Sequence, residues 1–339
     1  MSFVRPKAIA VPGYDLPPSS LLSDSALKTI QAFTENKQVW QADIRDQCSP
    51  VKGKPNRLAE ADSYYRSALY QNFTRRYNVA VTTQVIAGVT TEHVVPSNLD
   101  AMNANKVLIN CHGGAFVGGS RTMSRAESIP IAAHGGLKVI SIDYRMAPEY
   151  QFPAATEDVV KVYRALLEQY PADCIGLYGC SAGALLTAQS LARFQAEGLP
   201  LPAAVGLFYC GAYYWGDGDS GSMVRGLLSY PLGDLADYPY FAGLDRSDPT
   251  VFPGHSDRLM EAFPPSLLIS ATRDFALSSV VHTHSRLVQA GVEAELHIWE
   301  GLDHVFQYDP ELSESRDAYE CTADFFRRQL CLEPLDSAI

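Results

Sequence analysis

The sequence predicts an α/β fold in which helices flank a mostly parallel β-sheet on both faces. Two observations support this prediction. Eight short runs of apolar residues follow one another from about residue 79 onward, and most lack the polar alternation of a half-exposed strand. Amphipathic segments with helical spacing lie between these runs, as expected where crossover helices connect parallel strands.

The predicted strands span residues 79–88, 90–96, 106–111, 138–144, 174–180, 204–210, 266–272 and 293–299. The predicted helices carry apolar residues at i, i+3 and i+4, as in 23–40 and 156–169. The last helix is predicted to begin with Asp309 as N-cap and Pro310 at its first position, and to run toward Leu330.

The predicted domain organisation is one catalytic core with two additional segments. Strands begin only after a helical and irregular section, so residues 1–78 are expected to form an N-terminal cap segment. The core is predicted to consist of 79–210 and 264–335. Between them, 211–263 is rich in Gly, Pro, Asp and Tyr and is longer than an ordinary loop, which predicts a second cap insertion.

The composition disfavours several classes of function. Of 339 residues, 47% are hydrophobic, and the formal net charge of −11 disfavours nucleic-acid binding. No apolar run is long enough to cross a bilayer. Seven cysteines form no C-x-x-C pair, so free thiols in a reducing, cytoplasmic location are expected. His282 and His284 would point to different faces of a helix, and no metal site is expected.

The segment GCSAG at 179–183 fits a nucleophile elbow, the sharp turn from strand to helix that exposes one side chain. An apolar strand precedes it, and a helical pattern that ends near Gly198 follows it. Small residues two positions before and after Ser181 relieve crowding in the turn. A turn centred on Cys180 would put Tyr178 at a crowded position. Ser181 is therefore the predicted nucleophile, and Cys180 is predicted to be a buried apolar residue.

A serine hydroxyl needs a base, and His304 is the predicted base. It lies in the loop directly after the last predicted strand, and the carboxyl ends of parallel strands are where such sheets carry functional side chains. The other histidines after Ser181 fall in the predicted insertion, in a helix or in a strand: His255, His282, His284 and His297.

The predicted supporting acid is Asp274. It follows a predicted strand and precedes His304, which matches the order Ser, Asp, His that this type of elbow uses. Asp303 is the rival by proximity. Adjacent residues rarely face one another well enough for a carboxylate to hold an imidazole, so Asp303 is predicted to be a turn residue. Asp274 is expected to accept the imidazole N–H and fix its tautomer.

The glycine-rich segment HGGAF at 112–116 directly follows the third predicted strand. Glycines let backbone N–H groups approach a ligand closely. The N–H groups of Gly113 and Gly114, together with that of Ala182, are predicted to form the oxyanion hole. His112 is expected to brace the loop rather than to titrate during catalysis.

Together, these motifs resemble the hormone-sensitive-lipase-like family of α/β-hydrolases, which includes many microbial carboxylesterases. The resemblance rests on HGGAF, DYRMAPEYQFPAATED, GCSAG, RDFALSS and GLDHVF, which occur in family order between about 106 and 306. It implies an α/β-hydrolase fold with a mostly parallel eight-stranded sheet, flanked by helices and covered by a helical cap. It also implies catalytic roles for Ser181, Asp274 and His304.

The sequence departs from the family pattern at three positions. Ala115 replaces the third glycine of the oxyanion motif, Cys180 replaces the acidic residue or threonine before the nucleophile, and Ala184 replaces the glycine after the elbow. The predicted oxyanion donors lie at other positions, so the changes bear on pocket shape and substrate. Four residues of the segment 143–158 are expected to organise the scaffold: Asp143, Arg145, Pro148 and Glu149.

The predicted function is hydrolysis of short- to medium-chain acyl esters through an acyl-enzyme intermediate, with no metal or organic cofactor. The expected partner is a small-molecule ester, with no nucleic acid and no membrane insertion, and a homodimer is possible by family analogy. Lactone hydrolysis and amide deacetylation would use the same residues and are the alternatives. All three triad residues are present, which disfavours a non-catalytic receptor. The chain has no room for the large extra domain of many peptidases on this fold.

The two predicted cap segments are rich in aromatic residues with polar tips, which suit the wall of a partly hydrated pocket. The alternative for many of them is packing within the cap. They are expected to close over Ser181 and to limit the acyl chain to about two to eight carbons. These residues are Phe33, Trp40, Tyr64, Tyr65 and Tyr70 in the N-terminal segment and Tyr213, Tyr214, Trp215, Tyr230, Tyr238, Tyr240 and Phe241 in the insertion.

Overall fold

The computed structural model describes residues 16–35, 67, 70, 74–224, 235, 238–309 and 311–332. These residues form an eight-stranded sheet with the order β1-β2-β4-β3-β5-β6-β7-β8. The pairs β1–β2 and β2–β4 are antiparallel, and the other neighbours are parallel. The strands are β1 (Val79–Ile86), β2 (Val89–Pro96), β3 (Val107–Cys111), β4 (Lys138–Ile142), β5 (Ile175–Cys180), β6 (Ala204–Phe208), β7 (Ser266–Ala271) and β8 (Ala294–Trp299).

All eight predicted strands are present, and each end lies within two residues of its predicted place. Every residue of β3, β5, β6 and β7 is buried, because helices cover both faces of the sheet. The two edge strands, β1 and β8, are the more exposed ones. The mostly parallel α/β sheet predicted from the sequence is therefore confirmed.

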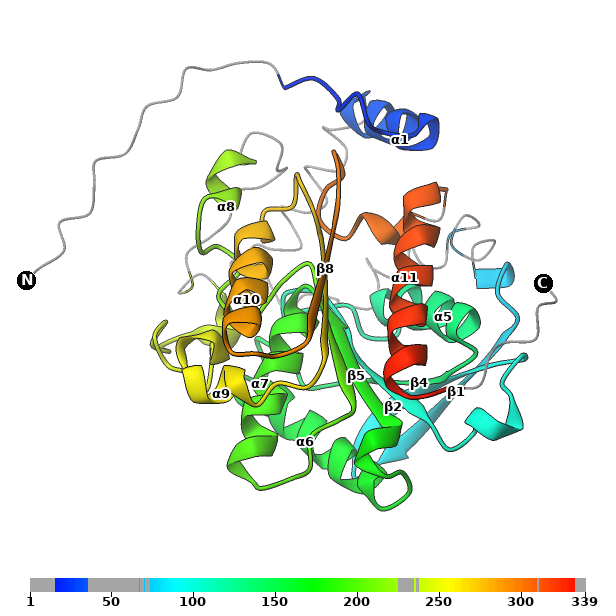
Figure 1. The fold of residues 1–339 in the computed structure, drawn as a ribbon, viewed down its shortest axis with the longest axis vertical. Coiled ribbons are helices and arrows are strands. Elements are labelled where there is room, and N and C mark those ends of the chain that lie inside the picture. The colour runs from blue at the N-terminus through cyan, green and yellow to red at the C-terminus, as the bar shows by residue number, and fades with distance from the viewer. Residues whose placement is uncertain are drawn as a thin grey trace, which may run out of the picture.

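Helices pack in two layers around this sheet, one on each face (Figure 1). Alternate residues of β3 enter the two hydrophobic cores, with Ile109 packed on the side of α6 and α7 and Leu108 on the side of α5 and α11. One layer contains α5 (Met123–Gly135) and α11 (Ser313–Gln329), and the other contains α6 (Ala154–Leu167), α7 (Ala182–Ala196) and α10 (Leu277–Gln289).

The start of α11 differs from the sequence-based prediction. The helix begins at Ser313 with Leu312 as its N-cap, so a start at Asp309 is wrong. The Asp309 carboxylate instead accepts a hydrogen bond from the N–H of Glu311 at 2.9 Å, which closes a local turn ahead of the helix. Pro310 lies outside the described residues.

The described part of the N-terminal segment rests against the loops that follow β7 and β8. Its helix α1 (Asp24–Glu35) lies within the first predicted helix, whose end falls outside the described residues. Thr29 donates a hydrogen bond to the Asp309 carboxylate at 3.0 Å, and the Arg273 guanidinium donates one to the carbonyl of Pro17 at 2.6 Å. Figure 1 shows α1 beyond the end of α11.

The region between β6 and β7 contains only short helices among its described residues: α8 (Ser220–Met223), η4 (Pro239–Phe241), η5 (Pro253–His255) and α9 (Asp257–Glu261). Elsewhere the short 3₁₀ helices are η1 (Ala101–Asn103), η2 (Ala172–Cys174) and η6 (Phe306–Tyr308). Of the helices that the structure describes, none has both the length and the apolar character needed to cross a bilayer.

The aromatic residues of this region are packed into the core rather than lining an open wall. Tyr240 stacks on Phe116 with ring centroids 4.1 Å apart, and Trp215 meets Tyr238 edge to face at 4.8 Å. Five of the predicted wall residues are at most 6% exposed: Tyr213, Tyr214, Trp215, Tyr240 and Phe241. Tyr230, Trp40, Tyr64, Tyr65 and the side chain of Phe33 lie outside the described residues.

Candidate active site

The elbow predicted around Ser181 is a turn between β5 and α7. The backbone of Ser181 adopts φ 53° and ψ −120°, a conformation that residues other than glycine rarely take. Its N–H donates a hydrogen bond to the carbonyl oxygen of Phe208 at 2.7 Å. The turn is too tight for larger residues on either side. A Cβ at Gly179 would lie 2.2 Å from the carbonyl oxygen of Gly183, and one at Gly183 would lie 1.8 Å from that of Cys111.

The structure brings Ser181, His304 and Asp274 together in one hydrogen-bonded line. The Ser181 Oγ atom is 2.8 Å from His304 Nε2, and His304 Nδ1 is 2.8 Å from Asp274 Oδ1. The Asp274 side chain is fully buried, whereas the His304 side chain is 17% exposed. An imidazole held between a hydroxyl and a buried carboxylate can accept the hydroxyl proton and activate the oxygen as a nucleophile.

Further hydrogen bonds fix the Asp274 carboxylate. Oδ2 accepts from the hydroxyl of Ser270 at 2.7 Å, and Oδ1 accepts from the N–H of Ala276 at 2.8 Å. The carboxylate therefore cannot rotate away from the imidazole without losing these partners. The rival carboxyl of Asp303 interacts with His304 through charge, but it makes no hydrogen bond with the His304 ring in the described structure.

Two aromatic rings that the sequence analysis did not single out flank the imidazole of His304. The Phe275 ring lies 4.2 Å from it, centroid to centroid, and the Tyr209 ring meets it edge to face at 5.8 Å. Tyr209 has a positive φ of 58° and bonds the side chain of Gln307 through its hydroxyl at 3.1 Å. These rings limit the rotation of the imidazole. The only sequence signal for Phe275 was its place next to Asp274.

Cys180 is buried beneath the elbow, as predicted. Its side chain is fully buried, and its sulfur accepts a hydrogen bond from the amide of Gln307 at 3.3 Å. Burial raises the pKa of the Cys180 thiol well above its usual value, because the thiolate would be separated from water. The nucleophilic form of the sulfur is therefore disfavoured.

The glycine-rich loop after β3 provides some of the predicted oxyanion donors but not all of them. The N–H of Gly113 donates to Glu127 Oε1 at 2.9 Å, so its assignment as an oxyanion donor is corrected. The N–H groups of Gly114 and Ala115 make no hydrogen bond to another described residue. Ala182 begins α7, and the first N–H groups of a helix have no partner within it.

His112 braces this loop. Its Nδ1 atom lies 2.7 Å from the carbonyl oxygen of Gly113, and its ring stacks on Tyr144 with centroids 4.2 Å apart. Its Nε2 atom is buried and has no partner among the described residues. Burial also lowers the pKa of His112, because a charged ring here would lack water. The neutral ring with its hydrogen on Nδ1 fits these contacts.

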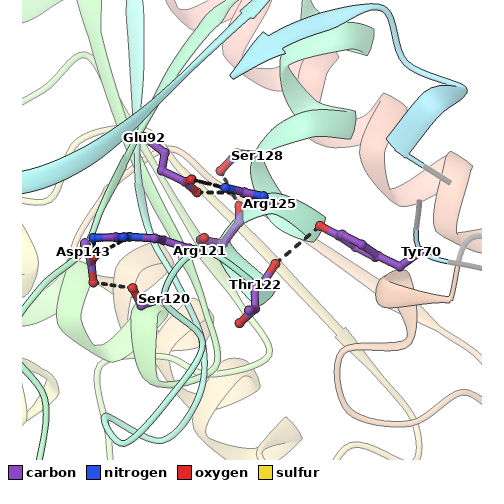
Figure 2. Close-up of polar contacts among 9 residues, drawn as sticks. Tyr70, Glu92, Ser120, Arg121, Thr122, Arg125, Ser128 and Asp143 are labelled. Atoms are coloured by element: carbon purple, nitrogen blue, oxygen red, sulfur yellow. Dashed lines mark hydrogen bonds and ion pairs between the residues drawn. The ribbon is translucent and has the colours of Figure 1, made fainter. Parts of the chain in front are cut away.

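Ion pairs and hydrogen bonds anchor the far end of this loop and the start of α5. Figure 2 shows the Arg121 guanidinium on the Asp143 carboxylate, at 2.9 Å, and Arg125 on Glu92, at 2.6 Å. The hydroxyl of Ser120 also donates to Asp143. Asp143 therefore holds the loop, as expected of a scaffold residue.

His282 and His284, which the sequence places two residues apart, contact groups of the protein other than a metal ion. His284 Nε2 lies 3.2 Å from the carbonyl oxygen of Ala294, and the His282 ring packs on Tyr213 with centroids 4.6 Å apart. In the part of the chain that the structure describes, no group of three His, Cys, Asp or Glu side chains is arranged to hold a metal ion.

Comparisons with known proteins agree with the fold of this chain. A family model described as the alpha/beta hydrolase fold matches residues 108–308. An acetyl-hydrolase of Streptomyces hygroscopicus is 32% identical over 244 residues, which cover 70% of this chain and 79% of that protein. The crystal structure of the esterase E25 has a TM-score of 0.78 at 30% identity and covers 96% of this chain and 99% of that one. An esterase of the bacterial hormone-sensitive lipase family has a TM-score of 0.74 at 26% identity, with 87% and 98% covered.

Proposed function

The chain belongs to the hormone-sensitive-lipase-like family of α/β-hydrolases, and we propose that it is a serine carboxylesterase with Ser181 as its nucleophile. The observation that carries this proposal is the line of hydrogen bonds from Ser181 through His304 to Asp274. In this arrangement the imidazole can accept the proton of the serine hydroxyl and activate its oxygen as a nucleophile.

The reaction proceeds in two steps through an acyl-enzyme. His304 takes the proton of Ser181 as the oxygen attacks the ester carbonyl, and it then returns that proton to the departing alkoxide. A water molecule, deprotonated by His304, next attacks the acyl group, and the His304 imidazolium then donates that proton to the departing Ser181 oxygen as the acid is released. Asp274 stabilises the imidazolium that forms in each step and does not itself transfer a proton.

The oxyanion is stabilised by backbone N–H groups. We assign Gly114 and Ala182 as donors and add Ala115, because the N–H of Gly113 is already bound to Glu127. Ala115 has a positive φ of 51° and follows Gly114 in the same turn. Preorganised donors of this kind act on charge that develops only in the transition state.

The substrate proposed is an ester with a short or medium acyl chain. The packed aromatic rings around Phe116 adjoin the glycine-rich loop, and Phe275 covers one side of His304. We infer that these packed rings limit the space for a long acyl chain. We also propose that residues 1–78 and 211–263 are cap segments. The hydrogen bonds of the N-terminal segment with Arg273 and Asp309 support this role for residues 1–78.

A series of p-nitrophenyl esters tests this function. We expect kcat/KM to peak between about two and eight acyl carbons, with each methylene that fits contributing up to about 1 kcal/mol. Lactones and acetylated amides in the same assay separate the alternative activities, and Ser181→Ala provides the background rate. Equal kcat/KM for chains of about four and about sixteen carbons would contradict the proposed limit on chain length.

The free cysteines bear on the cellular setting of the protein. Six described cysteines are free thiols: Cys111, Cys174, Cys180, Cys210, Cys321 and Cys331. Free thiols persist in reducing compartments, which supports a cytoplasmic location. We also propose a homodimer through the edge of β8, which among the described strands pairs only with β7.

A further inference from the structure

Glu127 is a buried carboxyl group that the mechanism above does not use. It lies on α5 with none of its surface exposed, and its Oε1 atom accepts hydrogen bonds from two loops of the site. The donors are the N–H of Gly113, at 2.9 Å, and the hydroxyl of Tyr308. Gly113 belongs to the glycine-rich loop, and Tyr308 lies in η6, just after His304. One oxygen atom therefore joins the oxyanion loop to the histidine loop.

The surroundings of the second oxygen of Glu127 favour a protonated carboxyl group. Both Glu127 Oε2 and Asn110 Oδ1 are buried acceptors without a hydrogen-bond partner in the described structure. The amide nitrogen of Asn110 donates hydrogen bonds to the hydroxyl oxygens of Ser128, at 3.0 Å, and Ser141, at 2.9 Å. A buried carboxylate oxygen that receives no hydrogen bond favours the protonated group, because ionisation would leave its charge uncompensated.

The charge state of Glu127 changes near neutral pH. Burial raises the pKa of Glu127 to about 7, and the hydrogen bonds from Tyr308 and Gly113 offset this only in part. Arg125, on the same helix, is paired with Glu92. Burial also keeps the other groups around the carboxyl neutral at this pH, by raising the pKa of the thiols and phenols and lowering that of the imidazole: Cys111, Cys180, Tyr144, Tyr178 and His112.

We propose that Glu127 is a positioning residue, which fixes the oxyanion loop and is uncharged in the active enzyme. By holding the N–H of Gly113, it orients the peptide units that follow, so that Gly114 and Ala115 present their N–H groups to the carbonyl oxygen bound at Ser181. An ionised Glu127 places a negative charge next to this loop and opposes the negative charge of the transition state. The inference rests on the proposed esterase function.

The first test is the pH profile of kcat and KM for the wild type and for Glu127→Gln, from about pH 5 to about pH 9. Glutamine can accept the same two hydrogen bonds and stays neutral. We expect kcat of the wild type to fall about ten-fold on the alkaline side, with a midpoint near 7, and kcat of Glu127→Gln not to fall. KM should be the same in both, because the oxyanion exists only in the transition state. Superimposable kcat profiles would overturn the proposal.

Two further variants separate positioning from general damage to the fold. Tyr308→Phe removes a donor that favours the ionised carboxyl, so the alkaline fall in kcat should move to higher pH. Glu127→Leu removes the acceptor and should lower kcat about ten-fold or more at every pH, with KM within about two-fold. An unshifted alkaline fall in Tyr308→Phe, or wild-type kcat in a folded Glu127→Leu protein, would contradict the proposal.

The matched control is Glu92→Gln. Glu92 is also a buried carboxyl, but its partner is Arg125 of α5 (Figure 2), whereas Gly113 and Tyr308 donate to Glu127. Its variant should keep the alkaline fall of the wild type. An absence of ester turnover in the wild type would refute the esterase function itself. Turnover with the same pH profile in Glu127→Gln would refute only the role of Glu127.

Discussion

Replacing Ser181 by alanine is expected to lower kcat by about 10³-fold or more. The substitution removes the oxygen that His304 Nε2 contacts at 2.8 Å and leaves the rest of the hydrogen-bonded line in place. The measurement is the steady-state hydrolysis of the preferred p-nitrophenyl ester, together with mass spectrometry of the acyl-enzyme formed by a slow substrate. Binding and the oxyanion donors remain, so KM should change little.

The matched control is Cys180→Ala, at the neighbouring position of the same turn. Cys180 is fully buried, and burial keeps the pKa of its thiol high, so the variant should retain most of the wild-type activity. An acyl group found on Cys180, with Ser181 unmodified, would refute the assignment of the nucleophile.

Replacing Asp274 by asparagine should lower kcat by about 10³-fold while the protein still folds. Asparagine has nearly the same shape and can keep contacts with Ser270 and Ala276, but it cannot stabilise the imidazolium of His304 with a full charge. Near-UV circular dichroism and thermal unfolding check the fold, and single-turnover kinetics measure the chemical step.

Asp303→Asn serves as the control for this prediction, because Asp303 is adjacent to His304 in the chain and exposed. Its kcat should stay within about three-fold of the wild-type value, since its carboxylate makes no hydrogen bond with the ring. A loss in Asp303→Asn as large as that in Asp274→Asn would show that the supporting acid has been assigned to the wrong residue.

Local patterns were sufficient to predict the strands and the residues at their carboxyl ends. β5 is an unbroken apolar run followed by small residues, and that pattern alone indicated both the buried strand and the turn at Ser181. Asp274 and His304 were predictable for a similar reason, because each lies in a loop after a recognisable strand.

Features that depend on tertiary contacts could not be predicted in this way. The predicted start of α11 was wrong because an aspartate side chain can either cap a helix or close a turn. Asp309 closes a turn with Glu311 and also accepts a hydrogen bond from Thr29 of the N-terminal segment. The N–H of Gly113 was predicted to bind the oxyanion because the neighbouring sequence does not indicate that Glu127 accepts its hydrogen bond. The one sequence feature that could have indicated this contact is a single glutamate, Glu127, within the apolar part of α5. Its other partner, Tyr308, is far from it in the sequence.

The backbone conformation of Ser181 lowers the stability of the fold at the same residue that the activity requires. A positive φ of 53° costs a residue with a side chain about 1–3 kcal/mol, and glycine largely avoids that cost. The inactive variant Ser181→Gly should therefore unfold at a higher temperature than Ser181→Ala, which keeps the strained conformation. Selection for thermal stability alone would favour a protein that no longer cleaves esters. The serine can persist at this turn only while turnover itself is under selection.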